Sequence, residues 1–163
     1  GFDEEQIIPH HESFPGLGDN IEILQAEKEG KLFMVGFVAD QLPKWEAIKH
    51  WVKFLNQDTP VFVGTEKIAQ RTHSAIYYTY TTRVKRGYYE IRVECLAKDA
   101  SKLKEFEATE LYYKRLEANI MESPELWLWT HKRWKRTREE FEEREKRRHE
   151  TLKQMSKGHM VNQ

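Results

Sequence analysis

The sequence has a single cysteine, no excess of charge of either sign and no long apolar run. Because Cys95 is alone, an intramolecular disulfide and a zinc site built from cysteines are both excluded. The 27 lysines and arginines balance the 27 aspartates and glutamates, so net charge gives no argument for nucleic-acid binding. No apolar run approaches the roughly 18 residues that cross a bilayer, and no signal peptide is visible. The 163 residues suffice for one domain with a core.

Metal ligands are also sparse. His10 and His11 adjoin Glu12, but no other residue has metal-site spacing with them. No glycine-rich phosphate-binding loop is present. We therefore expect no metal and no other cofactor.

The first predicted strand is a near-continuous apolar run, KLFMVGFVA, at residues 31–39. Such a run is typical of a strand that is buried on both faces, as in a parallel sheet covered by helices. Gly30 precedes the run. Before that glycine, Asp19 can cap a short helix that ends at Glu29.

Two further predictions concern the residues that follow. Residues 43–58 mix aromatic and polar residues and predict a loop with some helix. Thr59 and Pro60 predict the start of a helix, because threonine caps the first turn and proline fits there without an N–H. We expect this helix to end near Arg71.

The clearest hairpin signal lies at residues 74–84 and 88–96, which are rich in β-branched residues and tyrosine. Arg86 and Gly87 separate the two runs, and glycine is free to take a positive φ in the turn. The sequence therefore predicts a β-hairpin here.

Three helices are predicted after the hairpin. Thr109 would cap the first, which runs to about Glu122. Ser123 and Pro124 would start a tryptophan-rich second helix, and residues 137–157 form a solvated third one, because nearly all of them are charged or polar. The order of strand, helix, hairpin and helices favours an α/β fold, in which the hairpin extends a mixed sheet with flanking helices.

Residues 123–135 combine tryptophans and cations to an unusual degree: Trp127, Trp129, His131, Lys132, Arg133, Trp134 and Lys135. This composition suits a place where apolar groups meet anions, such as a lipid headgroup, a phosphate-bearing substrate or a partner surface. Glutamates alternate with the cations from residue 139 to 150, which breaks any phosphate-tracking stripe. We therefore expect no nucleic acid as partner.

Three groups of polar residues are candidates for a site. Asp40 and Gln41 follow the predicted strand, where open α/β sheets bind ligands; alternatively, they bond only to nearby loop backbone. Thr59 and Gly64 lie at the predicted helix start, which attracts anions; ordinary capping is the alternative. His131, which Arg133 and Lys135 flank, either faces an anion or helps to pack the tryptophans.

Five segments of the chain follow one another in an order that resembles a known family: Asp40-Gln41, residues 54–64 from Phe-Leu-Asn through Thr-Pro-Val-Phe to Gly, Lys67-Ile68-Ala69, residues 86–91, and residues 124–135. Together they resemble the C-terminal half of the lipid A biosynthesis acyltransferases of the lauroyl/myristoyl type. The run Leu-Pro-Lys-Trp after Asp-Gln is similar to the version in Bacteroides-type bacteria. The resemblance covers about residues 31–138.

This resemblance implies a glycerolipid-acyltransferase-like α/β sandwich, of which the chain holds a part. The family moves an acyl chain from acyl carrier protein to a lipid A precursor at the cytoplasmic face of the inner membrane. Its general base is a histidine followed, after four intervening residues, by a carboxylate. None of the seven histidines here has Asp or Glu five positions later. The resemblance thus implies a chain that is inactive alone and holds only substrate-side elements.

The resemblance also implies roles for the candidate residues. Asp40 and Gln41 would lie at the rim of the active site, and Thr59 and Gly64 would shape the acceptor or acyl pocket. The basic residues of the last motif would lie near anionic headgroups or the carrier protein; these are His131, Arg133 and Lys135.

We divide the chain into an irregular segment with a short helix at 1–30, an acyltransferase part at 31–138 and a charged helical tail at 139–163. Because the sequence begins at glycine without methionine, we expect a piece of a longer protein. A non-catalytic module that docks on a membrane surface or a partner through the tryptophan-rich basic helix is the alternative. An uncovered sheet edge would also allow a homodimer.

Overall fold

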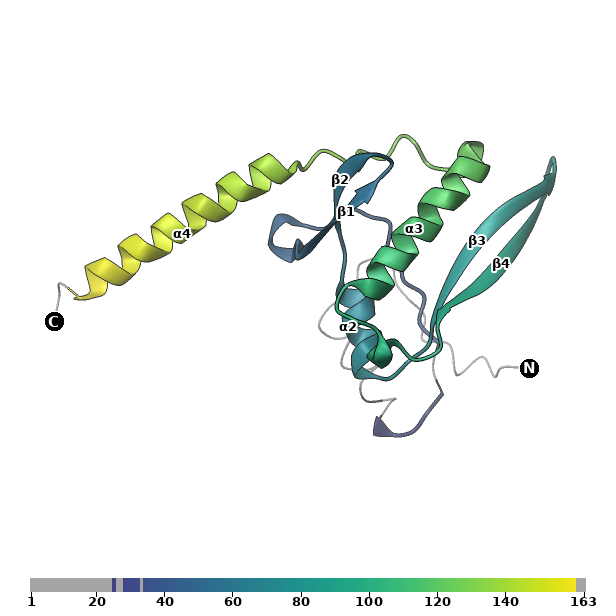
Figure 1. Ribbon diagram of the computed structural model, residues 1–163, viewed down its shortest axis with the longest axis horizontal. Helices are drawn as coiled ribbons and strands as arrows, with labels where there is room; N and C mark the ends of the chain where they lie inside the picture. Colours follow the sequence, from purple (N-terminus) through teal and green to yellow (C-terminus); the bar gives the residue numbers. More distant parts are fainter. Residues whose placement is uncertain (1–24, 26–27, 33, 161–163) are drawn as a thin grey trace.

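The structure, a computed structural model, describes residues 25, 28–32 and 34–160 (Figure 1). The predicted cap Asp19 and the pair His10 and His11 lie outside the described residues. The main elements, in chain order, are β1 His50–Phe54, β2 Gln57–Val61, α2 Gly64–Arg71, β3 Ile76–Lys85, β4 Tyr88–Ala97, α3 Glu107–Glu122 and α4 Arg138–Met160.

The described strands form two separate antiparallel pairs, β1–β2 and β3–β4. Helix α3 lies between them and packs on both (Figure 1). The core joins the first pair to α3 and includes Phe54 and Val61 of the strands with Tyr113, Leu116 and Ile120 of the helix. The chain therefore mixes helices and strands as predicted, but the predicted mixed sheet is wrong for the described residues.

Residues 31–39 do not form the predicted buried strand. Apart from a single bridge at Met34, the described part of this run has no regular structure, and none of the described strands pairs along it. Leu32, Met34 and Val38 are each at least 65% exposed. The apolar composition predicted burial, but no neighbouring strand among the described residues covers this run.

The prediction of a loop with some helix is confirmed for residues 43–49, which include the 3-10 turn Trp45–Ala47, but it is wrong from His50 on, as is the helix start at Thr59. Leu55 and Asn56 both take a positive φ, 49° and 62°, in a two-residue turn that pairs Phe54 with Gln57. Thr59 and Pro60 therefore lie in β2 and not at a helix start. Proline is tolerated because β2 is an edge strand. Helix α2 begins at Gly64 and ends, as predicted, at Arg71.

The β3–β4 hairpin confirms the sequence prediction, with Gly87 at a φ of 80° in its turn. Alternate residues of β3, Tyr78 and Tyr80, lie on the side of α3. There Tyr78 packs edge-on against Tyr112 of the helix, and Arg115 lies over the Tyr80 ring. The opposite face of the hairpin is exposed.

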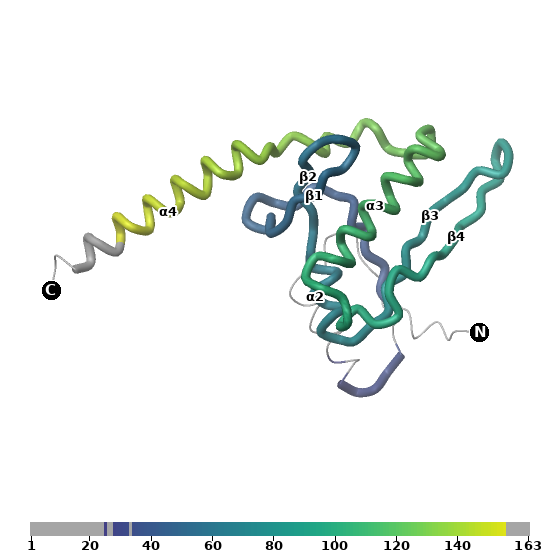
Figure 2. Tube along the Cα trace, viewed as in Figure 1, coloured from purple at the N-terminus to yellow at the C-terminus, as the bar shows by residue number. Residues whose placement is uncertain are grey.

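The tryptophan-rich α-helix predicted from Ser123 is wrong. A single 3-10 turn, η4 Pro124–Leu126, is followed by an irregular segment up to α4. Trp127 and Trp134 both pack against the core beside Phe54. The predicted solvated helix is confirmed as α4, which projects away from the body (Figures 1 and 2).

Helix α3 begins at Glu107, so Thr109 lies in its first turn and does not cap it. The cap is the carboxylate of Glu66 in α2, which is only 3% exposed. Its Oε2 accepts hydrogen bonds from the Thr109 N–H at 2.9 Å and from the Thr109 hydroxyl at 2.5 Å. A negative charge at a helix N-terminus is favourable, so this glutamate joins α2 to α3.

We expect Glu66→Ala to lower the free energy of unfolding by about 1–3 kcal/mol, because both Thr109 donors would be buried without an acceptor. The control is Glu105→Ala, at an exposed position, which should change the free energy of unfolding by less than about 0.5 kcal/mol. Urea denaturation measures both. Equal effects of the two substitutions would contradict the assigned role of Glu66.

Candidate functional site

Asp40 and Arg133, which the sequence analysis placed in two separate motifs, form an ion pair. The Arg133 Nη2 donates to Asp40 Oδ2 at 3.1 Å. The arginine is buried, at 3% exposure, whereas the Asp40 side chain is 30% exposed. The pair joins the end of the apolar run 31–39 to the tryptophan-rich segment across 93 residues of sequence.

The guanidinium of Arg133 lies among aromatic rings. Its central carbon is 4.7 Å from the ring centre of Trp127 and 5.8 Å from that of Phe54. Aromatic faces attract a cation and partly compensate for the water it has lost. The Nη1 atom is buried without a hydrogen-bond partner. Because removing a charge from water is costly, Asp40 is essential to keeping this arginine inside.

Tyr113 holds the backbone next to Asp40. Its hydroxyl donates to the carbonyl oxygen of Ala39 at 3.1 Å. Burial raises the pKa of Tyr113 and that of its neighbour Tyr112 above the ordinary value, and burial also raises the pKa of Tyr78 to about 12. All three phenols are therefore protonated at neutral pH, and that of Tyr113 donates the bond to Ala39.

Thr59 is the third predicted site residue that lies in this region, at 1% exposure. Its hydroxyl donates to the carbonyl of Gln57 at 3.1 Å and accepts from the indole N–H of Trp134 at 2.8 Å. Both bonds lie within the protein, so Thr59 ties β2 to the tryptophan-rich segment.

The remaining predicted residues, Gln41, Gly64, His131 and Lys135, are exposed. A side chain added at Gly64 would meet no atom within 4 Å, so a close backbone approach does not explain this glycine. The structure thus separates the seven predicted residues into two groups. Asp40, Thr59 and Arg133 belong to the buried cluster, and the other four face solvent.

Sequence reasoning missed the aromatic surroundings of Arg133. The buried face of α3 runs through Tyr113, Leu116 and Ile120, and Tyr113 packs edge-on against Phe54, one of the rings near the arginine. Spacings of three and four residues were present in the sequence and would have found Tyr113.

A histidine–carboxylate contact was also missed. His50 Nε2 lies 3.0 Å from Glu110 Oε1, and the imidazole ring stacks on Phe106 with ring centres 4.2 Å apart. The pair joins β1 to α3 across 60 residues. It does not have the sequence spacing of the base motif that the family resemblance implies.

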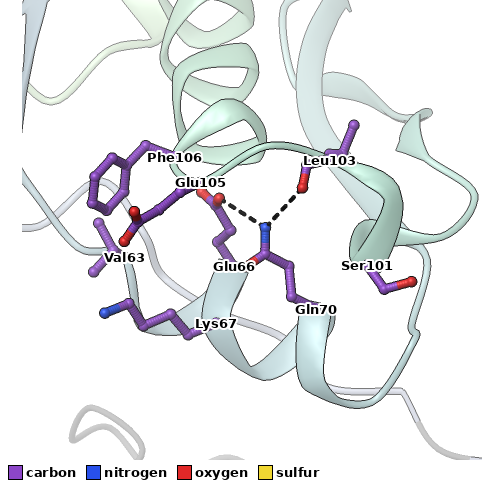
Figure 3. Close-up of a pocket in the computed structure, with 8 residues that line it drawn as sticks. All are labelled: Val63, Glu66, Lys67, Gln70, Ser101, Leu103, Glu105 and Phe106. Carbon is purple, nitrogen blue, oxygen red and sulfur yellow. Dashed lines mark hydrogen bonds between the residues drawn. The ribbon is translucent and has the colours of Figure 1, made fainter.

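A pocket of about 330 Å³ lies between α2 and the loop before α3 (Figure 3). Exposed Lys67 and Glu105 are part of its lining. Inside it, Gln70 donates to Glu66 and to the carbonyl of Leu103. Its buried polar groups are therefore already paired within the protein, and none of the seven predicted residues lines it.

Two features are absent from the described part of the chain. It contains no group of three or more His, Cys, Asp or Glu residues that could hold a metal ion. None of its helices combines the length and the apolar character that a membrane crossing requires.

We expect Asp40→Ala to lower the free energy of unfolding by about 2–3 kcal/mol, since it leaves Arg133 buried without its carboxylate. The control is Asp58→Ala, which removes exposed ion pairs to Lys53 and Arg138 and should cost less than about 1 kcal/mol. Chemical denaturation compares the two. Equal losses of unfolding free energy in the two variants would contradict the stabilising role of the Asp40–Arg133 pair.

Comparison with protein families finds one match of high coverage. The model of the bacterial lipid A biosynthesis acyltransferases matches residues 14–136. These residues include the Asp40–Arg133 pair, both hairpins and helix α3. Neither the curated proteins nor the solved structures gave a match. Because the matched residues make up most of the sequence, the chain belongs to the bacterial lipid A biosynthesis acyltransferase family.

Proposed function

We propose that this chain forms the substrate-binding part of an enzyme that moves an acyl chain from acyl carrier protein to a lipid A precursor. The observation that carries the proposal is the family match over residues 14–136. The Asp40–Arg133 contact supports it, because it brings together the two motifs that the resemblance places at the site. The Bacteroides-type variant of the family and a location at the cytoplasmic face of the inner membrane are part of the same proposal.

The reaction needs a base that removes the proton of the acceptor hydroxyl, so that the oxygen attacks the thioester carbonyl and the carrier thiolate leaves. No histidine of this sequence has Asp or Glu five positions later. We propose that the base and its carboxylate come from polypeptide outside these 163 residues, and that the chain alone is inactive.

The buried and the exposed residues have different proposed roles. Asp40, Thr59 and Arg133 position the segments around them, since their polar groups bond mainly within the protein. Exposed His131 and Lys135 are placed to contact the anionic groups of the acceptor or the carrier protein. Gln41 and Gly64 are assigned to the same surface, at the rim and at the acceptor or acyl pocket respectively.

His131→Ala tests this assignment, because His131 is exposed and its loss leaves the core intact. In the acyltransferase as the cell makes it, we expect kcat/KM for the lipid A precursor to fall about tenfold or more, the value of a hydrogen bond to a charged group. The 163-residue chain by itself should give no product. The assay follows the transfer of labelled acyl chains from acyl carrier protein.

The control for that experiment is His149→Ala, another exposed histidine, on α4, which should leave the rate unchanged. The melting temperature of each variant should match that of the parent. A wild-type rate for His131→Ala would contradict its role, and product formed by the chain alone would contradict the proposed division of the enzyme. Asp40→Ala is less informative here because it also destabilises the fold.

The second candidate function is docking on an anionic membrane by the tryptophan-rich segment. One observation favours it: Leu128 and Trp129 are 68% and 56% exposed, and exposed Lys132 and Lys135 follow them in the chain. Aromatic and aliphatic side chains beside lysines are typical of proteins that bind at the bilayer interface. Trp134 does not belong to this surface, because its indole N–H bonds to Thr59.

Flotation with vesicles of phosphatidylglycerol and phosphatidylethanolamine tests docking. Replacing Leu128 and Trp129 together by serine should reduce the bound fraction severalfold, because less apolar surface enters the bilayer. The matched control replaces Leu152 and Met155, which are equally exposed on α4. Binding that is absent in the unmodified chain, or that the control reduces as much, would eliminate this candidate.

A further inference from the structure

The outer face of the β3–β4 hairpin is apolar and has no cover among the described residues. In the paired register, Thr79 lies opposite Val93 and Thr81 lies opposite Ile91 on this face. Val93 is 62% and Ile91 is 75% exposed. Aliphatic side chains exposed side by side are typical of a surface that contacts a partner or a membrane.

The other face of the hairpin shows the reverse character. Tyr78, Tyr80 and Arg115 meet there, and Glu94 of β4 forms an ion pair with Arg115 of α3. The hairpin therefore turns Glu94 toward the neighbouring helix and Ile91 and Val93 outward. This arrangement is opposite to that of a sheet that faces water with its polar side.

Cations and tyrosines gather at the tip. Lys85, at the end of β3, and Arg86, in the turn, are exposed, and the Lys85 ammonium lies 4.2 Å from the ring centre of Tyr88. Tyr88 and Tyr89 are 61% and 57% exposed. Arg83 and Arg92 are paired with carboxylates, so the charge left for an external partner comes mainly from Lys85 and Arg86.

The tip is joined to the second exposed apolar segment. Arg83 Nη2 donates to Glu125 at 3.1 Å, and Glu125 lies in η4, just before Leu128 and Trp129. Figure 1 shows the hairpin tip and the end of α3 at the same end of the molecule. Two apolar, cation-bearing elements are thus held next to each other by an ion pair.

We infer that the β3–β4 hairpin is a lipid-binding element that inserts its tyrosine-rich tip and outer face into the interface of an anionic bilayer. Charge complementarity selects this occupant: Lys85 and Arg86 face phosphate headgroups, tyrosines occupy the interfacial region, and Ile91 and Val93 reach acyl chains. The inference extends the docking candidate above, but the hairpin contributes independently of Leu128 and Trp129.

The hairpin is tested by flotation of the full chain with phosphatidylglycerol–phosphatidylethanolamine vesicles and with phosphatidylcholine vesicles. Replacing Lys85 and Arg86 together by glutamine should lower the affinity for the anionic vesicles on the order of tenfold, and should leave the weak binding to phosphatidylcholine unchanged. The control replaces Lys98 and Lys102, two exposed lysines near the base of the hairpin, by glutamine and should have little effect.

The apolar contribution needs a second pair of variants. Tyr89→Ser with Ile91→Ser should weaken binding to both vesicle types severalfold, whereas Leu32→Ser with Met34→Ser, which are exposed elsewhere, should not. Circular dichroism and thermal unfolding verify that each variant is folded.

Separate outcomes distinguish this inference from the earlier proposals. If the hairpin variants bind vesicles as the parent does, while the Leu128–Trp129 variant does not, docking stands and the hairpin inference fails. If the hairpin variants convert a dimer into monomers in sedimentation, a second copy covers this face, and the lipid is the wrong occupant. Equal losses in the hairpin and control variants also overturn the inference.

Discussion

The buried guanidinium of Arg133 is the constraint on which the rest of the site depends. A cation with 3% exposure needs a carboxylate and polarisable neighbours, and the chain supplies Asp40, Trp127 and Phe54. Because these residues come from three distant segments, satisfying one charge fixes the end of the apolar run, the first hairpin and the tryptophan-rich segment relative to one another. Tyr113 and the Thr59–Trp134 bond then hold the same three segments through neutral groups.

This arrangement explains why the motif residues fall into two groups. The polar atoms of Asp40, Thr59 and Arg133 that bond within the protein position the segments around them. Exposed residues beside them, such as Gln41 and His131, are available for an external ligand. A second internal carboxylate, Glu66, plays the corresponding part at the start of α3, and the two anchors together set the position of the helix that carries Tyr113.

The elements that were predicted correctly are those that neighbouring residues in the sequence determine. The prediction of the β3–β4 hairpin was correct because its turn glycine and its β-branched strands act over a few residues. The prediction of α4 was correct because its residues are good helix formers whose opposite charges pair three and four positions apart. Thr59 and Pro60 have the composition of a helix start, yet pairing with β1 prevails. The composition of residues 123–135 predicted a helix that meets external anions. The helix is wrong, since these residues form a single 3-10 turn and an irregular segment, and the external anion stays a prediction. The contact between Asp40 and Arg133 spans 93 residues and has no local signal at all.

The most direct test of the account is amide hydrogen exchange of the chain with and without a phosphorylated, acylated lipid A precursor. The account predicts slower exchange at residues 40–41 and 128–135, next to the Asp40–Arg133 pair, with little change in α2 and the loop before α3. Protection confined to the pocket beside Glu66, or no protection anywhere, would contradict a substrate-binding role for the segments that Arg133 holds together.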